Sequence, residues 1–424
     1  MKYLCMGGQQ TLLMLLITML LGVPASAAVQ VLSIDEAVRL ALQNNVNLQA
    51  QRHTIAEAEG ELLSARIFPH NPQLEVEGAA GSERNGERED AHSFGVELSQ
   101  ELELGGQQRL RIRIATAGLK QTQWEVRDAQ RELIKEVKEA FYRILFLEER
   151  QTFVKQTVDL AQQLSRIAEA RFSAGESPQL DVNLALVELQ NTLRQRGEVR
   201  RRLTQARFAL NRLLGHPVGA PLDLSGSLGI PPQPIDTTQL LLQALQQRPD
   251  LQSRSAAVEI ATGEVGLAKA ERIPDVEVGF IFEQEVEGEN VKNVFGGKIS
   301  FPLPLWNRNQ GEIRAAQARF RAAELERMAL QQAIETEVVS AVAEVNQLRL
   351  AVQLFEQTIL PQSRENLTLL RQAFAAGEIG IVALITQQRE FIATNNEYLD
   401  TRFEYQEALA VLQSSTGAYL KGQQ

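Results

Sequence analysis

The sequence contains two successive copies of one plan, and this duplication strongly limits what the chain can fold into. The stretch ALQ at 41–43 recurs as ALQ at 244–246, and FSAGE at 172–176 recurs as FAAGE at 374–378. Further matching stretches keep the same order along both halves. Self-similarity on this scale indicates a duplicated structural unit, so we predict two units with the same order of elements.

The N-terminus has the features of an export signal. Lys2 supplies a positive charge, an apolar run extends from Thr11 to Val23, and the run ends in the small residues 25–27. This pattern is typical of a signal peptide with its cleavage site. The run is short for a membrane-spanning helix of about 20 residues, although a retained anchor is the alternative. We predict a signal peptide over 1–27, which removes the lone Cys5.

The rest of the chain divides at a proline-rich stretch. We assign a first repeat to 28–215, a linker to 216–235, a second repeat to 236–417 and a tail to 418–424. The linker holds five prolines, which remove backbone donors and fix φ. We therefore expect it to pack on the outside, without continuing a helix or a sheet.

Long helices are predicted in both repeats. Ser33 and Glu36 have the spacing of a capping box, which predicts a helix from Ser33 to Ile67. A second helix, from Gln107 to Phe172, contains no proline and would be on the order of 100 Å long. In the second repeat, apolar residues from Ile334 to Ile359 recur in steps of four and three, which is the spacing of a coiled-coil seam. Pro361 is predicted to kink or interrupt that helix.

Four stretches alternate between apolar and polar residues, as membrane strands do when one face meets lipid and the other meets water. A soluble antiparallel sheet with one face on a core gives the same pattern. The tips of the two predicted β-hairpins, at 81–90 and 285–293, are predicted as long loops. The charged residues of the predicted inner face are Glu75, Glu77, Glu97, Glu101, Glu277, Glu283 and Lys298.

Four strands are too few to close a barrel around a water-filled bore. Open strand edges in hydrocarbon would leave backbone groups unpaired, at several kcal/mol each. Several copies of the chain must therefore share one barrel, so we predict a homo-oligomer.

The plan of helix, hairpin, long helix, turn and helix, given twice after a signal peptide, resembles the TolC-type outer-membrane efflux family over essentially the whole mature chain. Within that family, the sequence FPLPLWNRNQG at 301–311 is similar to the strand-to-helix junction of the CzcC/CusC branch, which serves heavy-metal pumps of the RND class. The junction residues are Gly105 and Gly106 in the first repeat, and Pro302, Pro304, Trp306 and Asn307 in the second.

This resemblance implies a mainly α-helical chain with a membrane β-barrel portion. It implies a homotrimer with one barrel of twelve strands, continued by a coiled-coil tunnel in the periplasm. The barrel would lie in the lipid of the outer membrane of a Gram-negative cell. The expected partners are a periplasmic membrane-fusion adaptor and an inner-membrane RND-type pump.

Two glycine turns would form the periplasmic tips of the tunnel. The first carries Gly175, Glu176, Pro178 and Asp181, and the second carries Gly377, Glu378 and Ile381. Glycine suits the left-handed residue that ends a helix, and Pro178 suits the first turn of the next. The functional interpretation is that the tips meet the adaptor and close the tunnel; alternatively, they only turn the chain. Asp181 is the candidate for an acidic constriction, since the matching positions in the second repeat are Ala383 and Thr386.

Enzymatic and nucleic-acid functions find no support in the sequence. It shows no nucleophile–base or phosphate-loop motif, and we expect no cofactor. The net charge of −10 argues against a nucleic-acid partner. The four histidines are scattered and the mature chain lacks cysteine, so metal-ligand spacing is missing. We therefore expect a channel that conducts cations past its glutamates without holding them; alternatively, the glutamates only hydrate the wall.

The predicted function is a passive exit duct for divalent heavy-metal cations, either Co/Zn/Cd or Cu/Ag, delivered by the pump and the adaptor. An outlet for drug efflux or type I secretion is the alternative with the same architecture. A periplasmic coiled-coil scaffold or adaptor is the alternative from a different class.

Overall fold

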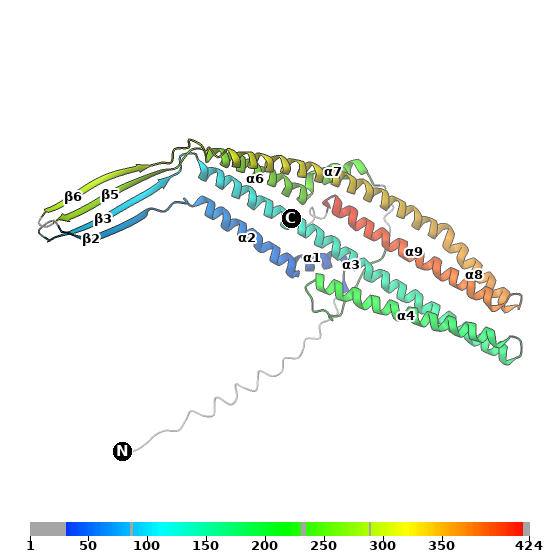
Figure 1. The fold of residues 1–424 in the computed structure, drawn as a ribbon. Helices are drawn as coiled ribbons and strands as arrows, with labels where there is room; N and C mark the ends of the chain where they lie inside the picture. Colours follow the sequence, from blue (N-terminus) through cyan, green and yellow to red (C-terminus); the bar gives the residue numbers. More distant parts are fainter. Residues whose placement is uncertain (1–30, 85–87, 230–234, 288–289, 419–424) are drawn as a thin grey trace, which may run out of the picture.

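The computed structural model describes residues 31–84, 88–229, 235–287 and 290–418. The predicted signal peptide at 1–27 and nearly all of the predicted tail lie outside these residues. The described chain is elongated, with a sheet at one end and long helices running away from it (Figure 1). Within the described ranges, none of the helices combines the length and the apolar character that crossing a membrane requires.

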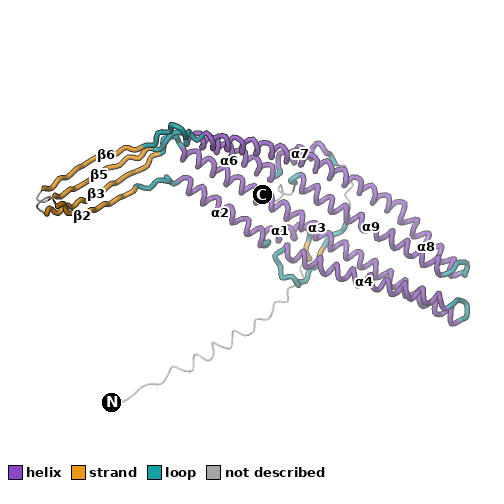
Figure 2. The backbone as a smooth tube through the Cα atoms, viewed as in Figure 1, coloured by secondary structure: helices purple, strands orange, loops and turns teal. Residues whose placement is uncertain are grey.

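The first repeat follows the predicted order of elements, as the tube in Figure 2 also shows. Its elements are β1 (Val31–Leu32), α1 (Ile34–Asn44), α2 (Val46–Arg66), β2 (Gln73–Arg84), β3 (Arg88–Leu102), α3 (Gln107–Ser173) and α4 (Gln179–Leu213). The long helix α3 is confirmed as one unbroken element of 67 residues, roughly 100 Å in length.

The second repeat has the same order, with one irregular turn. Its elements are α5 (Thr237–Gln247), α6 (Pro249–Ala270), β5 (Val276–Glu287), β6 (Asn290–Ser300), α7 (Gln310–Leu354), η1 (Phe355–Ile359), α8 (Leu360–Ala375) and α9 (Ile381–Ser415). The π-helical turn η1 ends at Ile359, two residues before Pro361, whose ring excludes one backbone hydrogen bond. The α-helix is therefore interrupted near Pro361, as predicted, but only for this turn, and it resumes as α8 from Leu360.

The predicted continuous helix from Ser33 to Ile67 is wrong. The capping box is confirmed, since Ser33 N donates to Glu36 Oε2 at 3.1 Å and Glu36 N to Ser33 Oγ at 3.3 Å. At Asn45, however, the backbone is extended with ψ of 118°, and its side chain accepts a hydrogen bond from Leu48 N. Asn45 therefore ends α1 and begins α2, because the Asn side chain caps helices readily.

Helix packing buries the apolar stripe that the sequence predicts. Ile334, Val338 and Val345 are fully buried, each with 0% exposure. The linker also enters this packing: β4 (Asp223–Leu224) pairs in parallel with β1, and Leu228 is buried against the first-repeat core. The expectation of a linker that packs only on the outside is therefore wrong at these residues.

Lys138 of α3 makes the stability of the helical region depend on pH. Its Nζ donates to Gln413 Oε1 at 2.8 Å, and burial lowers its pKa from 10.5 to about 8, against the opposing charge of Asp35. Between these pH values the unfolded chain binds more protons than the folded one, so the unfolding free energy rises with pH. The charged ammonium therefore costs stability below pH 8.

We expect Lys138→Met to remove this cost. The variant should therefore have a higher unfolding free energy than the wild type below pH 8. This difference should shrink by roughly 2–3 kcal/mol between pH 8 and 10.5, since one pKa unit is about 1.4 kcal/mol. Thermal unfolding of the detergent-purified protein measures this change. Lys155→Met, at an exposed position of the same helix, is the control. A Lys138→Met advantage that stays constant over this range would contradict the expectation.

Candidate functional site

The sheet presents one polar face. Its strands are antiparallel in the order β2-β3-β5-β6, and directly paired residues share a face. Glu75 pairs with Glu97, and Glu101 pairs with Glu277. All the charged residues that the sequence analysis assigned to the inner face lie together here, namely Glu75, Glu77, Glu97, Glu101, Glu277, Glu283 and Lys298. Lys298 Nζ donates to Glu97 Oε1 at 2.9 Å, so this cation offsets part of the negative charge.

The opposite face of the sheet is apolar and exposed. Leu98 pairs with Phe280, and Phe282 pairs with Phe295. Phe280 is 71% exposed and Phe295 is 80% exposed. Contiguous apolar surface of this kind marks contact with a membrane or a partner. Ile281, which breaks the alternation in sequence, lies on the polar face opposite Glu97.

The two outer strands leave open edges within the part of the chain that the structure describes. There β2 pairs only with β3, and β6 pairs only with β5. The hairpins are also longer than predicted: ladder pairing continues to Arg84↔Arg88 in the first and to Glu287↔Asn290 in the second. The long tip loops predicted at 81–90 and 285–293 are therefore wrong.

Glycines shape the first junction between the sheet and the helices. Gly106 has φ of +74° at the start of α3, a conformation that glycine adopts without cost. A Cβ on Gly105 would lie 2.6 Å from the carbonyl oxygen of Ala270. The backbone of the first repeat therefore touches that of the second here, and any larger side chain at Gly105 would force them apart.

At the second junction, Pro302, Pro304 and the 86%-exposed Trp306 lie between β6 and α7. Asn307 Oδ1 accepts a hydrogen bond from Asn309 N. Asn309 was not among the predicted junction residues; it has φ of +57° and donates through its amide to Ala268 O and Glu271 Oε2. An asparagine in the NRN sequence was a usable signal, since Asn adopts this conformation more readily than most residues.

The two glycine turns lie beside each other at the end farthest from the sheet (Figure 1). Gly175 and Gly377 have φ of +77° and +78°. In each turn the residue after the glycine donates to a carbonyl five residues earlier, as in Glu176 N to Arg171 O at 2.8 Å. These bonds form Schellman motifs that end α3 and α8.

The remaining tip residues differ in how far they are accessible. Glu176 and Glu378 are exposed, and Asp181 is half-buried in the first turn of α4. Pro178 is the N-cap of α4 and precedes the first helical turn in which it was expected. Ile381 is only 2% exposed and packs between the two helical hairpins, so it holds the tips together.

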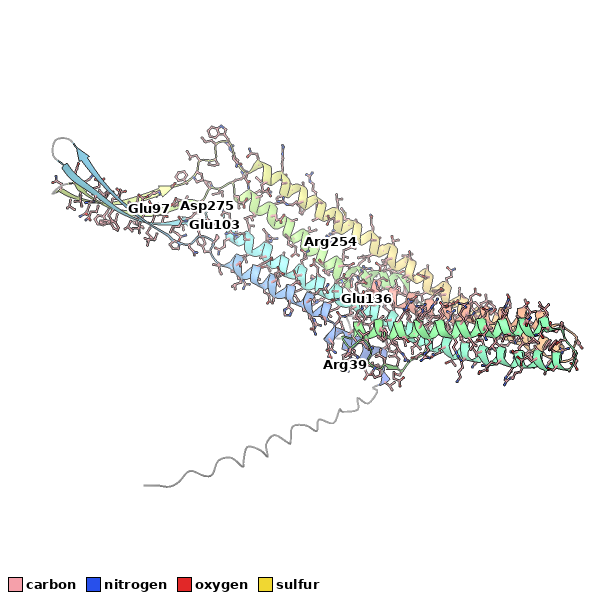
Figure 3. The ribbon with its side chains drawn as sticks, turned by 60° about the horizontal axis from the view of Figure 1, so that its bottom comes forward. Arg39, Glu97, Glu103, Glu136, Arg254 and Asp275 are labelled. Atoms are coloured by element: carbon pink, nitrogen blue, oxygen red, sulfur yellow. The ribbon has the colours of Figure 1, made fainter. Side chains whose placement is uncertain are left out.

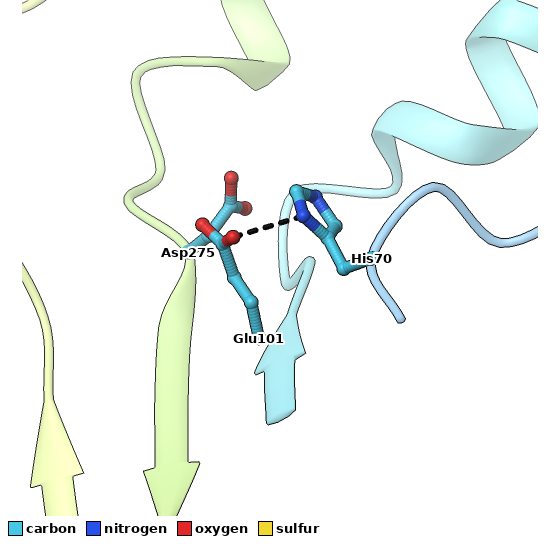
Figure 4. A group of neighbouring side chains, drawn as sticks. All are labelled: His70, Glu101 and Asp275. Carbon is cyan, nitrogen blue, oxygen red and sulfur yellow. Dashed lines mark ion pairs between the residues drawn. The ribbon is translucent and has the colours of Figure 1, made fainter. Parts of the chain in front are cut away.

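One group of side chains was missed altogether. His70, Glu101 and Asp275 meet where the sheet joins the helices (Figure 4). Figure 3 shows Glu97, Glu103 and Asp275 in this same region, far from Arg254 on the helices. The three members of the group come from the loop before β2, the end of β3 and the residue before β5. Their distance in sequence explains why no ligand spacing was visible.

Comparisons with known proteins agree with this architecture. Residues 37–216 and 240–418 match the family model described as outer membrane efflux protein. The cobalt-zinc-cadmium resistance protein CzcC of Cupriavidus metallidurans is 25% identical over 371 residues, covering 87% of this chain and 86% of that protein. The pyoverdine export outer membrane protein OpmQ of Pseudomonas aeruginosa is 23% identical over 414 residues, covering 91% and 84%.

Two solved structures are similar in fold. The structure of CusC has a TM-score of 0.75 at 20% identity and covers 91% of this chain and 92% of that chain. The outer-membrane channel OprN has a TM-score of 0.75 at 17% identity, covering 91% and 89%. At these identities the likeness is one of fold.

Proposed function

The chain belongs to the outer membrane efflux protein family, and we propose that it is the passive exit duct of a tripartite efflux system. The observation that carries the proposal is a sheet with one polar and one apolar face, continued by helices roughly 100 Å long. An apolar outer face suits lipid and a polar inner face suits water. The helices then extend the duct away from the bilayer.

The duct is a homotrimer. A single chain supplies four strands with unpaired edges at β2 and β6, and unpaired edges are excluded from hydrocarbon. Joining β6 of one copy to β2 of the next in a ring of three gives twelve strands, enough to enclose a bore. The signal peptide, the outer-membrane location and the periplasmic extension of the helices belong to this same proposal.

The tips dock onto a periplasmic adaptor that connects the duct to an inner-membrane RND-type pump. This proposal rests on their position at the end opposite the sheet and on their exposed carboxylates, Glu176 and Glu378. Asp181 lies beside them and is the candidate for an acidic constriction. The paired turns bring both repeats to one surface, so an adaptor can contact both at once.

The cargo is a divalent heavy-metal cation. The name of CzcC connects that relative with cobalt, zinc and cadmium, and the polar face of this chain carries more glutamates than lysines. Deleting the gene should lower tolerance to Zn²⁺, Co²⁺ and Cd²⁺, or to Cu⁺ and Ag⁺, and leave drug tolerance unchanged. Unchanged metal tolerance with increased drug sensitivity would assign the duct to a drug pump.

The charge of the polar face should set the ion selectivity of the duct. Replacing Glu75, Glu277 and Glu283 together with glutamine should reduce the cation-to-anion permeability ratio severalfold in planar bilayers, because fixed negative charge attracts cations. Lys298→Gln should shift the ratio the opposite way, since it frees Glu97 from its ion pair. Selectivity that is unchanged in both variants would mean that the glutamates only hydrate the wall.

A further inference from the structure

The group formed by His70, Glu101 and Asp275 has the geometry of a cation site. Nδ1 of His70 lies 2.9 Å from Oε2 of Glu101. One potential ligand atom from each of the three residues lies within 4.8 Å of the others. Metal ions such as zinc hold nitrogen and oxygen ligands at about 2.0–2.2 Å, so only small side-chain rotations are needed. His70 and Glu101, at 29% and 47% side-chain exposure, have the freedom to make them.

Neighbouring side chains orient two of these ligands. Nε2 of His70 faces Glu103 Oε1 at 3.5 Å, and Glu103 is itself buried in an ion pair with Arg111 at 2.6 Å. A carboxylate behind one ring nitrogen favours a proton there and leaves the other nitrogen free to bind a metal. Here that arrangement turns Nδ1 of His70 toward Glu101.

Asp275 is restrained in a similar way. Its Oδ1 accepts a hydrogen bond of 2.9 Å from Nε2 of Gln107, a residue that is only 3% exposed. The second oxygen of Asp275 can therefore turn toward His70 without losing this support. A buried amide that fixes a carboxylate is the type of outer contact that metal sites use to position their ligands.

The group lines a cavity that opens on the polar face of the sheet. The cavity has a volume of about 510 Å³, and its walls include Gln73, Ser99, Glu277 and Ser300. Ser99 pairs with Gln73, and Glu277 pairs with Ser300. The same face carries the glutamates of the proposed duct, so a bound ion would lie on the wall where the helices pass into the sheet.

We propose that His70, Glu101 and Asp275 form a binding site for a divalent first-row transition-metal ion such as Zn²⁺ or Co²⁺. One imidazole and two carboxylates are a ligand set that suits these ions. The three side chains leave coordination positions open for water. A site of this kind binds weakly enough to exchange, which conduction past it requires. The simpler interpretation is an ion pair of His70 with Glu101 and Glu103, without a metal ion. Zn²⁺ titration separates these two interpretations.

The test is Zn²⁺ titration of the detergent-purified full protein by calorimetry, with Co²⁺ absorption spectra to report the ligand set. We expect one ion per chain in the wild type. His70→Ala and Asp275→Asn should each lower the affinity about tenfold or more, because ligand loss opens the site. His53→Ala, at an exposed histidine on α2, should bind as the wild type does.

Circular dichroism and the electrophoretic mobility of unheated samples check that each variant keeps its fold. Equal Zn²⁺ affinity in His70→Ala and the wild type, or no Zn²⁺ bound by the wild type, would overturn the site. The site does not depend on the proposed cargo. If the protein binds Zn²⁺ but deleting its gene leaves metal tolerance unchanged, the proposed cargo is rejected and the site is kept. If the protein binds no Zn²⁺ but deleting its gene lowers metal tolerance, only the site is rejected.

Discussion

Replacing Arg248 with alanine is expected to destabilise the folded chain by about 3–5 kcal/mol, because removing one partner of a buried ion pair leaves the other charge uncompensated. Arg248 is only 4% exposed. Its guanidinium donates to both carboxylate oxygens of Asp250, at 3.1 and 2.6 Å, and to Glu337 Oε2 at 2.6 Å. It also reaches Ser415 O at 3.3 Å.

These contacts join the start of α6 to α7 and to the end of α9, so the loss of Arg248 should loosen the whole second repeat. Thermal unfolding of the detergent-purified protein measures the effect. Arg248→Lys keeps the charge but loses the planar fork, and it should fall between the wild type and Arg248→Ala. Arg254→Ala is the control, because Arg254 and its partner Glu326 are exposed and such pairs contribute about 0–1 kcal/mol. Equal losses at positions 248 and 254 would contradict the account.

The contribution of Arg248 should also depend on pH. Burial by itself would raise the pKa of Asp250, but hydrogen bonds and the charge of Arg248 lower it below its ordinary value of 3.8. A lowered folded-state pKa stabilises the protein above the unfolded value and loses that effect as the pH falls through the folded value. The stabilisation that ionised Asp250 gives the wild type should therefore be complete above about pH 4 and be lost in stronger acid, so the difference between the wild type and Arg248→Ala should shrink as the pH falls.

Phe280→Arg is expected to prevent assembly of the barrel. Phe280 lies on the apolar face, where it pairs with Leu98 on one neighbouring strand and with Gly297 on the other. An arginine on the lipid face of a membrane strand costs about 2–4 kcal/mol near the bilayer midplane. Each trimer would carry three such charges in one ring. We expect little or no heat-resistant trimer on electrophoresis of unheated outer-membrane samples.

Ile281→Arg is the matched control, because the next residue along β5 points to the other face. Ile281 pairs with Glu97 and Gly296, so an arginine there would face water and a carboxylate. The variant should assemble as the wild type does. If both variants assembled equally well, the apolar face would not meet lipid, and the sheet would have to lie in water.

Much of the fold follows from periodicity, because a repeat of apolar residues reports which face of an element is covered. The seam from Ile334 through Val345 predicted the buried stripe of α7, and the alternation around Glu97 predicted the polar face. These signals are local, so one stretch of sequence contains all that is needed to interpret them.

The features that were not predicted depend on contacts between distant segments, or on backbone conformations that the local residues allow but do not require. The break at Asn45 requires its side chain to cap α2, a choice that an apolar pattern does not record. The interruption predicted at Pro361 is present, but helix propensity does not distinguish this single π-helical turn from a full break of the helix. Charged hairpin ends looked like loops because polar residues suit both. The group at His70 forms only when the two repeats are placed side by side.

The most direct test of the closed barrel is disulfide cross-linking between the two open edges. Cys5, the lone cysteine, lies in the predicted signal peptide, so cysteines introduced in pairs along β2 and β6 can be interpreted without a background. Oxidation in outer membranes should join β6 of one copy to β2 of the next at one register, and the covalent ladder should stop at three chains. Disulfides found only within single chains, or a ladder that continues beyond three, would contradict the trimeric duct.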